Sequence, residues 1–288
     1  MSIPIFQVIN ASGELVDFEQ HKLIRSLEKS GAGEESIEKI LKEVAKTAIA
    51  SPTPFSTKSI YKLAYRLLKQ KAAHLAARYS LKQAIQDMGP SGYPFEVLIS
   101  ELLEYQGFKT RVGVLMEGRC VTHEVDVLAT KGQHVAFVEC KFHNDFGRKN
   151  DIKTPLYVQS RYLDLAFEWN RRNTDQIWET SGWIASNTQF TDDAITYSRC
   201  MNLNLIGWDY PQNGGSLRER IDRAGLHPIT CLTGLTKQEK QILMDKKIVL
   251  AHHLLENPKA LNALHFRDNR LHKVLDEAEK LIDMPVIR

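Results

Sequence analysis

The segment Val135–Phe142 constrains the fold most, because it combines the pattern of a buried β-strand with two opposite charges. Successive side chains of a strand point to opposite faces, so its even-numbered residues share one apolar face, and Glu139 and Lys141 share the other. The segment is apolar enough to be an interior strand, where charges are costly unless they are paired or bound to a metal. It therefore predicts a central strand that carries a charged site.

A second strand, predicted over Val121–Leu128, carries Asp126. The Lys131–Gln133 turn between the two strands favours a β-hairpin. A hairpin of this length can bring Asp126 close to Glu139, so that two carboxylates and the ammonium of Lys141 converge. Such a group can hold a divalent metal ion beside a phosphodiester. The alternative is a simple surface ion pair between Glu139 and Lys141, which contributes less than about 1 kcal/mol.

The composition bounds the class of protein. A length of 288 residues allows two or three domains, each with its own core. No apolar run approaches the roughly 20 residues of a membrane-spanning helix, and the N-terminus lacks the pattern of a signal peptide. The four cysteines form no CxxC motif, so we expect no zinc site built on them, no disulfide framework and a cytoplasmic location. A net charge of +3 is small, so any affinity for nucleic acid must come from local basic patches.

Periodicity and breaks divide the chain into three predicted domains. Residues 1–88 begin with short strands at Ile3–Ile9 and Glu14–Phe18 and continue as helices, the last of them over Ala72–Ala84. A Gly- and Pro-containing linker precedes residues 93–211, in which helices and strands alternate as in an α/β domain with a mixed sheet. Residues 235–288 have a helical pattern. The segment 211–234, which contains two prolines and four glycines, is expected to connect domains.

In residues 93–211 the spacing of Asp126, Glu139 and Lys141 resembles that of the PD-(D/E)XK nuclease superfamily. Together with Glu96 on the first predicted helix and Gln159 on a later one, it is similar to the Mrr-type restriction endonucleases. The resemblance implies a restriction-endonuclease-like mixed sheet and hydrolysis of DNA.

The resemblance also implies roles for these residues. Asp126, Glu139 and Glu96 would hold Mg²⁺ or Mn²⁺, because Mg²⁺ prefers oxygen ligands and lowers the pKa of bound water. Lys141 would contact the attacking water or a phosphate oxygen, and Gln159 would orient a ligand. Apart from the resemblance, Arg148, Lys149 and Lys153 follow the predicted strand that carries Glu139 and could grip phosphates, although a solvated loop is an equal alternative.

The N-terminal segment Val8–Phe18, with Ser56–Ile60 and Arg78–Leu81, resembles an ATP-cone. This is a regulatory nucleotide-binding domain known from ribonucleotide reductases and their transcriptional repressor. In that family a short hairpin over a helical bundle binds ATP or dATP. The corresponding positions in this chain are Val8, Asn10, Gly13, Lys22 and Thr57.

This chain departs from the ATP-cone pattern at one place. Asn10 and Ala11 stand where family members usually carry Lys-Arg, so two cations that would meet the phosphates are missing. The alternative is therefore a fold that binds no nucleotide and serves as a DNA-binding or dimerising cap. No glycine-rich phosphate loop is present, so ATP hydrolysis is not implied.

The C-terminal segment from Leu235 to Leu255 resembles a helix-hairpin-helix-like module, which would offer backbone amides to DNA phosphates. Its turn at Lys246–Ile248 lacks the glycine that is often found there, so a plain helical packing domain is the alternative.

These patterns predict a multidomain protein. A central α/β restriction-endonuclease-like mixed sheet is flanked by an N-terminal, mostly helical ATP-cone-like domain and a C-terminal helical module. We expect a metal-dependent DNA endonuclease of a restriction or repair system, regulated by ATP or dATP, with no membrane partner. Cutting both strands of a duplex would favour a homodimer. The alternatives are a non-catalytic nucleic-acid-binding regulator that keeps the nuclease fold and a nucleotide sensor in which ATP drives oligomerisation.

Overall fold

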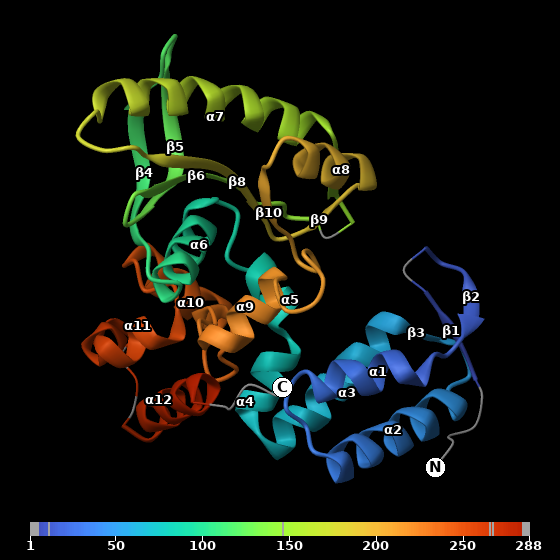
Figure 1. The fold of residues 1–288 in the computed structure, drawn as a ribbon. Helices are drawn as coiled ribbons and strands as arrows, with labels where there is room; N and C mark the ends of the chain where they lie inside the picture. The colour runs from blue at the N-terminus through green and yellow to red at the C-terminus, as the bar shows by residue number, and fades with distance from the viewer. Residues whose placement is uncertain (1–5, 11, 146, 265, 267, 284–288) are drawn as a thin grey trace.

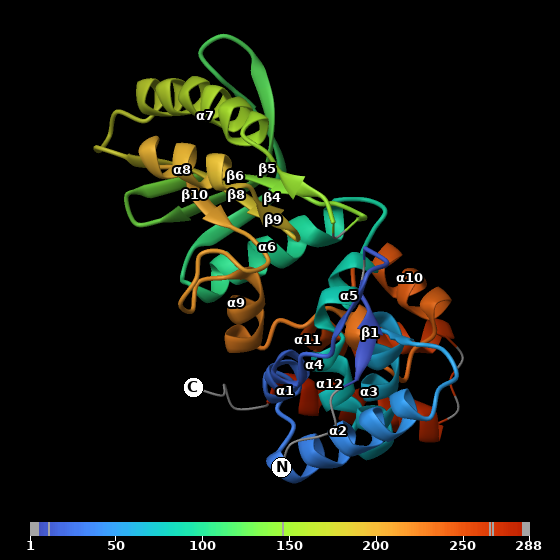
Figure 2. The same cartoon turned by 90° about the vertical axis from the view of Figure 1, so that its right-hand side faces the viewer.

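The computed structural model describes residues 6–283 except 11, 146, 265 and 267. Figure 1 shows a central sheet with helices on both faces, a group of N-terminal helices and a group of C-terminal helices. In Figure 2 the sheet and its helices form an upper lobe, and the N-terminal and C-terminal helices together form a lower one. No helix among the described residues is both long enough and apolar enough to cross a membrane.

The N-terminal part combines a small sheet with five helices. Its strands lie in the order β2-β1-β3, with β1 antiparallel to β2 and parallel to β3. The elements are β1 (Gln7–Ile9), β2 (Leu15–Asp17), α1 (Gln20–Glu28), α2 (Glu34–Ile49), β3 (Phe55–Ser56), α3 (Thr57–Lys71), α4 (Ala73–Tyr79) and α5 (Leu81–Gln86).

Two expectations for this part are modified. Residues 3–5 of the first predicted strand lie outside the described residues, and the strand that is described begins at Gln7. The single helix predicted over Ala72–Ala84 is wrong, because α4 ends at Tyr79 and α5 begins at Leu81. The hydroxyl of Ser80 donates a hydrogen bond to the carbonyl oxygen of Ala77 at 3.0 Å, which competes with the backbone bond that a continuous helix would make.

The central sheet has five strands in the order β10-β8-β6-β5-β4. Neighbours are antiparallel for β4, β5 and β6, and parallel for β6, β8 and β10. The prediction of a mixed sheet with an interior strand at β6 is confirmed. The elements are α6 (Tyr93–Tyr105), β4 (Lys109–Glu117), β5 (Thr122–Lys131), β6 (His134–Lys141), β7 (Lys149–Asn150), α7 (Lys153–Arg172), β8 (Glu179–Ser186), β9 (Gln189–Phe190), α8 (Asp192–Cys200) and β10 (Asn204–Ile206).

The hairpin of β5 and β6 forms as its turn residues predict. Lys131 pairs with His134 across the sheet, and Gly132 between them has a φ of +58°, which glycine adopts without strain. The two faces of β6 are both buried. Ala136 and Val138 pack in the core that contains α6, whereas Val135 and Phe137 pack against α7. The sheet is therefore a middle layer between α6 and α7, as Figure 1 shows.

The C-terminal part contains α9 (Leu217–Ala224), α10 (Lys237–Asp245), α11 (Ala251–Glu256) and α12 (Asp268–Ile282). The segment 211–234, expected to connect domains, also contributes to a core, because Leu217, Ile221 and Ile229 are fully buried. They belong to a core that also contains residues of α5, α6 and α10 to α12. A second core lies among α1 to α4. The boundaries of the three domains stay predictions.

The turn between α10 and α11 forms without the glycine that a helix-hairpin-helix module often has. Lys247 takes the left-handed conformation there, with a φ of +64°. Whether this module meets DNA stays a prediction.

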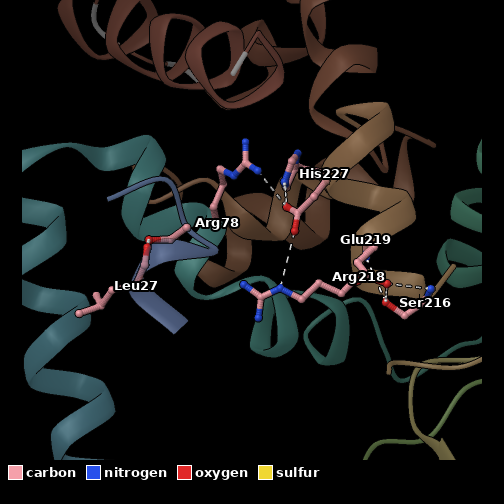
Figure 3. Close-up of polar contacts among 8 residues, drawn as sticks. Leu27, Arg78, Ser216, Arg218, Glu219 and His227 are labelled. Carbon is pink, nitrogen blue, oxygen red and sulfur yellow. Dashed lines mark hydrogen bonds and ion pairs between the residues drawn. The ribbon is translucent and has the colours of Figure 1, made fainter. Parts of the chain in front are cut away.

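A buried group of charges, which we call the α4–α9 cluster, joins the N-terminal helices to α9 (Figure 3). It consists of Arg78, Arg218, Asp222 and His227. Oδ1 of Asp222 lies 3.3 Å from Nη2 of Arg78 and 3.3 Å from Nε2 of His227, and its Oδ2 lies 3.6 Å from Nε of Arg218. One carboxylate thus meets three basic side chains.

Candidate active site

Asp126 and Glu139 lie where the ladder between β5 and β6 stops. The last backbone pair toward them is Val127 with Val138, so the next two residues along the strands are Asp126 and Glu139. Oδ2 of Asp126 accepts a hydrogen bond from the backbone N–H of Cys140 at 2.6 Å. The hairpin therefore brings the two carboxylates together, as their spacing predicts.

Glu139 is almost fully buried and meets a cation with each of its oxygens. Its Oε1 lies 2.5 Å from Nζ of Lys141, and its Oε2 is paired with Nη1 of Arg161. The expected alternative, an exposed ion pair, does not describe this geometry, because Glu139 is 11% exposed and Lys141 30%.

The sequence reasoning missed Arg161, which comes from α7. Its guanidinium also donates to the backbone carbonyl of Glu124. One signal could have identified it. Val158, Arg161 and Leu165 follow the spacing of one helix face, and both apolar members are buried, so a charged side chain on that face needs a partner.

Glu96 lies in the first turn of α6, which begins with Pro94 near its N-terminus as expected. Burial, followed by the charges of Asp126, Glu124 and Glu139, raises the pKa of Glu96 to about 7. Burial and the charge of Glu139 raise the pKa of Asp126 to about 6, although the N–H of Cys140 acts in the opposite direction. Asp126, Glu139 and Glu96, which we call the carboxylate cluster, are thus partly desolvated and repel one another.

This excess of negative charge fits a divalent cation, whose oxygen ligands would be these carboxylates. The cluster is loose, however. Among the described residues, the ligand atoms of Asp126, Glu139 and Glu96 are not all within 4.8 Å of one another. The three side chains would need to move closer together, and Glu139 would need to exchange a contact with Lys141 or Arg161.

Gln159 lies on α7 and is 6% exposed. Its Oε1 has no hydrogen-bond partner among the described residues, and no described hydrogen bond joins it to Asp126, Glu139 or Lys141. A buried polar atom without a partner is costly, so this oxygen is available to a ligand or to water.

The rim of this site is exposed and basic. Tyr157 is 54% exposed, and its ring centroid lies 5.6 Å from Nζ of Lys141 and 5.3 Å from the guanidinium of Arg161. The side chains of Arg148, Lys149 and Lys153 are exposed beyond the end of β6, so they can reach an anionic partner.

A separate cavity of about 450 Å³ lies in the N-terminal part. Four of the five residues expected to bind nucleotide line it, and Gly13 does not. Gly13 instead forms the turn after β1, with a φ of +87°. Tyr61 and Tyr79 also line the cavity, with their rings stacked 5.0 Å apart. The lining residues predicted from the sequence are Val8, Asn10, Lys22 and Thr57.

Two of these polar residues have partners within the chain. Oδ1 of Asn10 accepts hydrogen bonds from the backbone N–H groups of Ser12 and Glu14, each at 2.9 Å. Lys22 is paired with Glu19, but both side chains are well exposed, so this pair is easily exchanged for a contact with a ligand.

Comparisons with known proteins place the chain in a family. A family model described as AF1548-like, C-terminal, matches residues 227–282. An uncharacterized protein from Archaeoglobus fulgidus is 30% identical over 185 residues, which are 64% of this chain and 99% of that protein. The crystal structure of a protein of unknown function, AF1548, is 28% identical with a TM-score of 0.54, over 67% of this chain and 98% of that one. Because a relative is matched at this identity over nearly its whole length, the chain belongs to the AF1548-like family.

Proposed function

We propose that this protein is a metal-dependent endonuclease that hydrolyses DNA phosphodiester bonds at the carboxylate cluster. The observation that carries the proposal is the meeting of Asp126 and Glu139 on two adjacent strands, with Lys141 2.5 Å from Glu139. The strand order and the helices α6 and α7 on opposite faces of the sheet support a restriction-endonuclease-like fold for this part of the chain.

Each residue of the site has a separate role in this proposal. Asp126, Glu139 and Glu96 would hold Mg²⁺ or Mn²⁺, which when bound polarises the phosphate and makes water a better nucleophile. Lys141 donates a hydrogen bond to a non-bridging phosphate oxygen and so stabilises the negative charge that develops there. Arg161 neutralises Glu139 until the ion is bound.

The test is a plasmid-nicking assay with a titration of Mg²⁺ and Mn²⁺. Replacing Lys141 with alanine should slow cleavage by about 10²- to 10³-fold, because one donor to the developing charge is lost. The fold and much of the affinity for DNA should remain. Lys109→Ala is the matched control, because Lys109 is exposed at the start of β4 and makes no ion pair with the carboxylate cluster. Equal cleavage by the wild type and Lys141→Ala would refute the assignment.

A regulatory nucleotide site in the N-terminal cavity is the second candidate function, in keeping with an ATP-cone-like fold for this part. The cavity of about 450 Å³, its stacked tyrosines and the ammonium of Lys22 support it. A purine can stack on an aromatic floor, and a cation favours phosphate.

This second proposal is tested by titrating the full chain with ATP and dATP and measuring the heat of binding. Lys22→Ala should weaken binding about 10-fold, because one charge-assisted contact is lost. Lys42→Ala, an exposed lysine on α2 that is paired with Glu38, should have no effect. If neither nucleotide binds, the N-terminal part is a cap without a nucleotide. If Lys22→Ala binds either nucleotide as tightly as the wild type does, the ammonium of Lys22 does not hold the phosphates and the assignment to this cavity is refuted.

A further inference from the structure

We propose that Glu101, His252 and His253 form a binding site for a divalent transition metal ion of the Zn²⁺ class, which clamps α11 onto α6. The site does not overlap the carboxylate cluster and does not depend on endonuclease activity. Among the described residues, it is the group whose potential ligand atoms all lie within 4.8 Å of one another.

The distances between the ligand atoms match those of a tetrahedral site. Nε2 of His253 lies 3.1 Å from Oε1 of Glu101, and Nε2 of His252 lies 3.6 Å from Oε2 of the same carboxylate. With bonds of about 2.0–2.1 Å to zinc, two ligand atoms of a tetrahedron lie about 3.3 Å apart. The observed values lie on either side of this distance, but they run to the two different oxygens of Glu101. All three ligand atoms lie within 4.8 Å of one another, so the side chains must close by about 1 Å or turn to bring one oxygen and both imidazoles onto a single ion.

The chemistry of the three groups suits such an ion. Imidazole nitrogens and a carboxylate oxygen bind Zn²⁺ and its neighbours in the first transition series, whereas Mg²⁺ prefers oxygen alone. Hydrogen bonds from His252 and His253 lower the pKa of Glu101 to about 2, so its carboxylate is ionised, as ligation requires. The side chains are 18–26% exposed, which leaves a fourth coordination position open to water.

The surroundings already orient the two rings toward Glu101. Nδ1 of His253 lies 3.4 Å from the backbone N of both Val249 and Leu250, and Nδ1 of His252 is buried without a hydrogen-bond partner among the described residues. In each ring Nε2 is therefore the nitrogen that faces the carboxylate. Ligation through Nε2 of His253 moves its proton to Nδ1. Nδ1 can then no longer accept from the N–H groups of Val249 and Leu250, so the coordinate bond must outweigh the loss of these two long and weak hydrogen bonds.

The position of the site indicates a structural role for the ion. Glu101 lies on α6, the helix that packs on the sheet and carries Glu96, and both histidines lie on α11. They belong to the segment that matches the AF1548-like C-terminal family model. An ion here would join the C-terminal helices to the sheet and raise the stability of the folded chain, since it binds the folded form alone.

The test uses the full chain, stripped with a chelator and titrated with Co²⁺, followed by displacement with Zn²⁺. We expect one Co²⁺ per chain at this site, with the strong visible absorption of a tetrahedral ion and a rise in the melting temperature. Glu101→Gln and His252→Ala should each weaken binding by more than about 10-fold, since loss of a second-shell partner alone costs that much. His252 makes no capping bond to the backbone, so its variant should fold. His272→Ala is the control, because His272 is exposed on α12.

Three outcomes would overturn the proposal. The first is that stripped protein shows no tetrahedral Co²⁺ absorption. The second is that Glu101→Gln and His252→Ala bind Co²⁺ as tightly as the wild type, in which case the three side chains form only a hydrogen-bonded clamp. The third is that the absorption is lost in Glu139→Gln but kept in His252→Ala, which would assign the ion to the carboxylate cluster instead.

Discussion

The carboxylate cluster and the α4–α9 cluster are both buried groups of charged side chains. Acidic groups are in excess in the first and basic groups in the second. In the first, three carboxylates lie near two cations. In the second, two arginines and a histidine surround one carboxylate. Figure 3 shows Arg78 of α4, Arg218 of α9 and His227, just after the end of α9, directed toward that one acid.

The pKa values of the acids in the two clusters are shifted in opposite directions. Burial and neighbouring acids raise the pKa of Glu96 to about 7 and that of Asp126 to about 6. Burial acts in the same sense on Asp222, but the hydrogen bond from His227 and the charges of Arg78 and Arg218 outweigh it and lower its pKa. An acid that stabilises the fold is held in its charged form, whereas an acid kept partly protonated is typical of a functional site.

The largest expected effect is a loss of stability when the acid of the α4–α9 cluster is removed. Asp222→Ala should lower the free energy of unfolding by about 3–5 kcal/mol, because two buried guanidinium groups lose their counter-charge. The pKa of Asp222 is lowered in the folded state, so this contribution is present above its unfolded pKa and is lost as the pH falls through the folded value. Urea unfolding at pH 7 measures it.

Asp245→Ala is the matched control, because Asp245 is exposed and its side chain accepts a hydrogen bond from the neutral amide of Gln241. If Asp222→Ala unfolds at the same urea concentration as the wild type, the α4–α9 cluster does not hold the two parts of the molecule together.

A smaller effect, of opposite sign, is expected in the carboxylate cluster. With divalent ions removed, Glu96→Gln should raise the free energy of unfolding at pH 8 by about 1 kcal/mol after screening by solvent is allowed for. The pKa of Glu96 is raised from 4.5 to about 7 in the folded state, so ionising it destabilises the fold as the pH rises through that range. The gain should therefore be complete above pH 7 and absent near pH 4.5.

Urea unfolding at the two pH values checks this prediction, with Glu28→Gln as the control because Glu28 is exposed on α1. A loss of stability at pH 8 in Glu96→Gln would show that the carboxylates do not repel one another.

The smallest effect is expected where charges face solvent. Lys39→Ala removes an ion pair with Glu35 in which the side chains are 71% and 75% exposed. The urea midpoint of unfolding should stay within the error of the measurement, because water and salt screen such pairs. A change as large as that of Asp222→Ala would mean that burial does not determine how much an ion pair contributes to the stability of this protein.

Much of the sheet was predictable, because its signals are local. The alternation along β6, the glycine in the turn before it and Pro94 at the start of α6 each act within a few residues. The break at Ser80 was missed, because the apolar pattern continues across it and neither proline nor glycine marks it in the sequence. The burial of residues 217–231 was missed because prolines and glycines also occur in ordered segments of a core.

The sequence by itself determined which residues share a strand face and that the hairpin brings Asp126 beside Glu139, which is 13 residues away. Only the tertiary structure decided that Arg161 meets Glu139 and that Arg78 meets Asp222, 144 residues away. The same holds for Glu101 and His253, which are 152 residues apart. Backbone hydrogen bonds and side-chain alternation fix neighbours along an element. Partners on different helices depend on how those helices pack together, which many apolar contacts decide jointly and which no short pattern records.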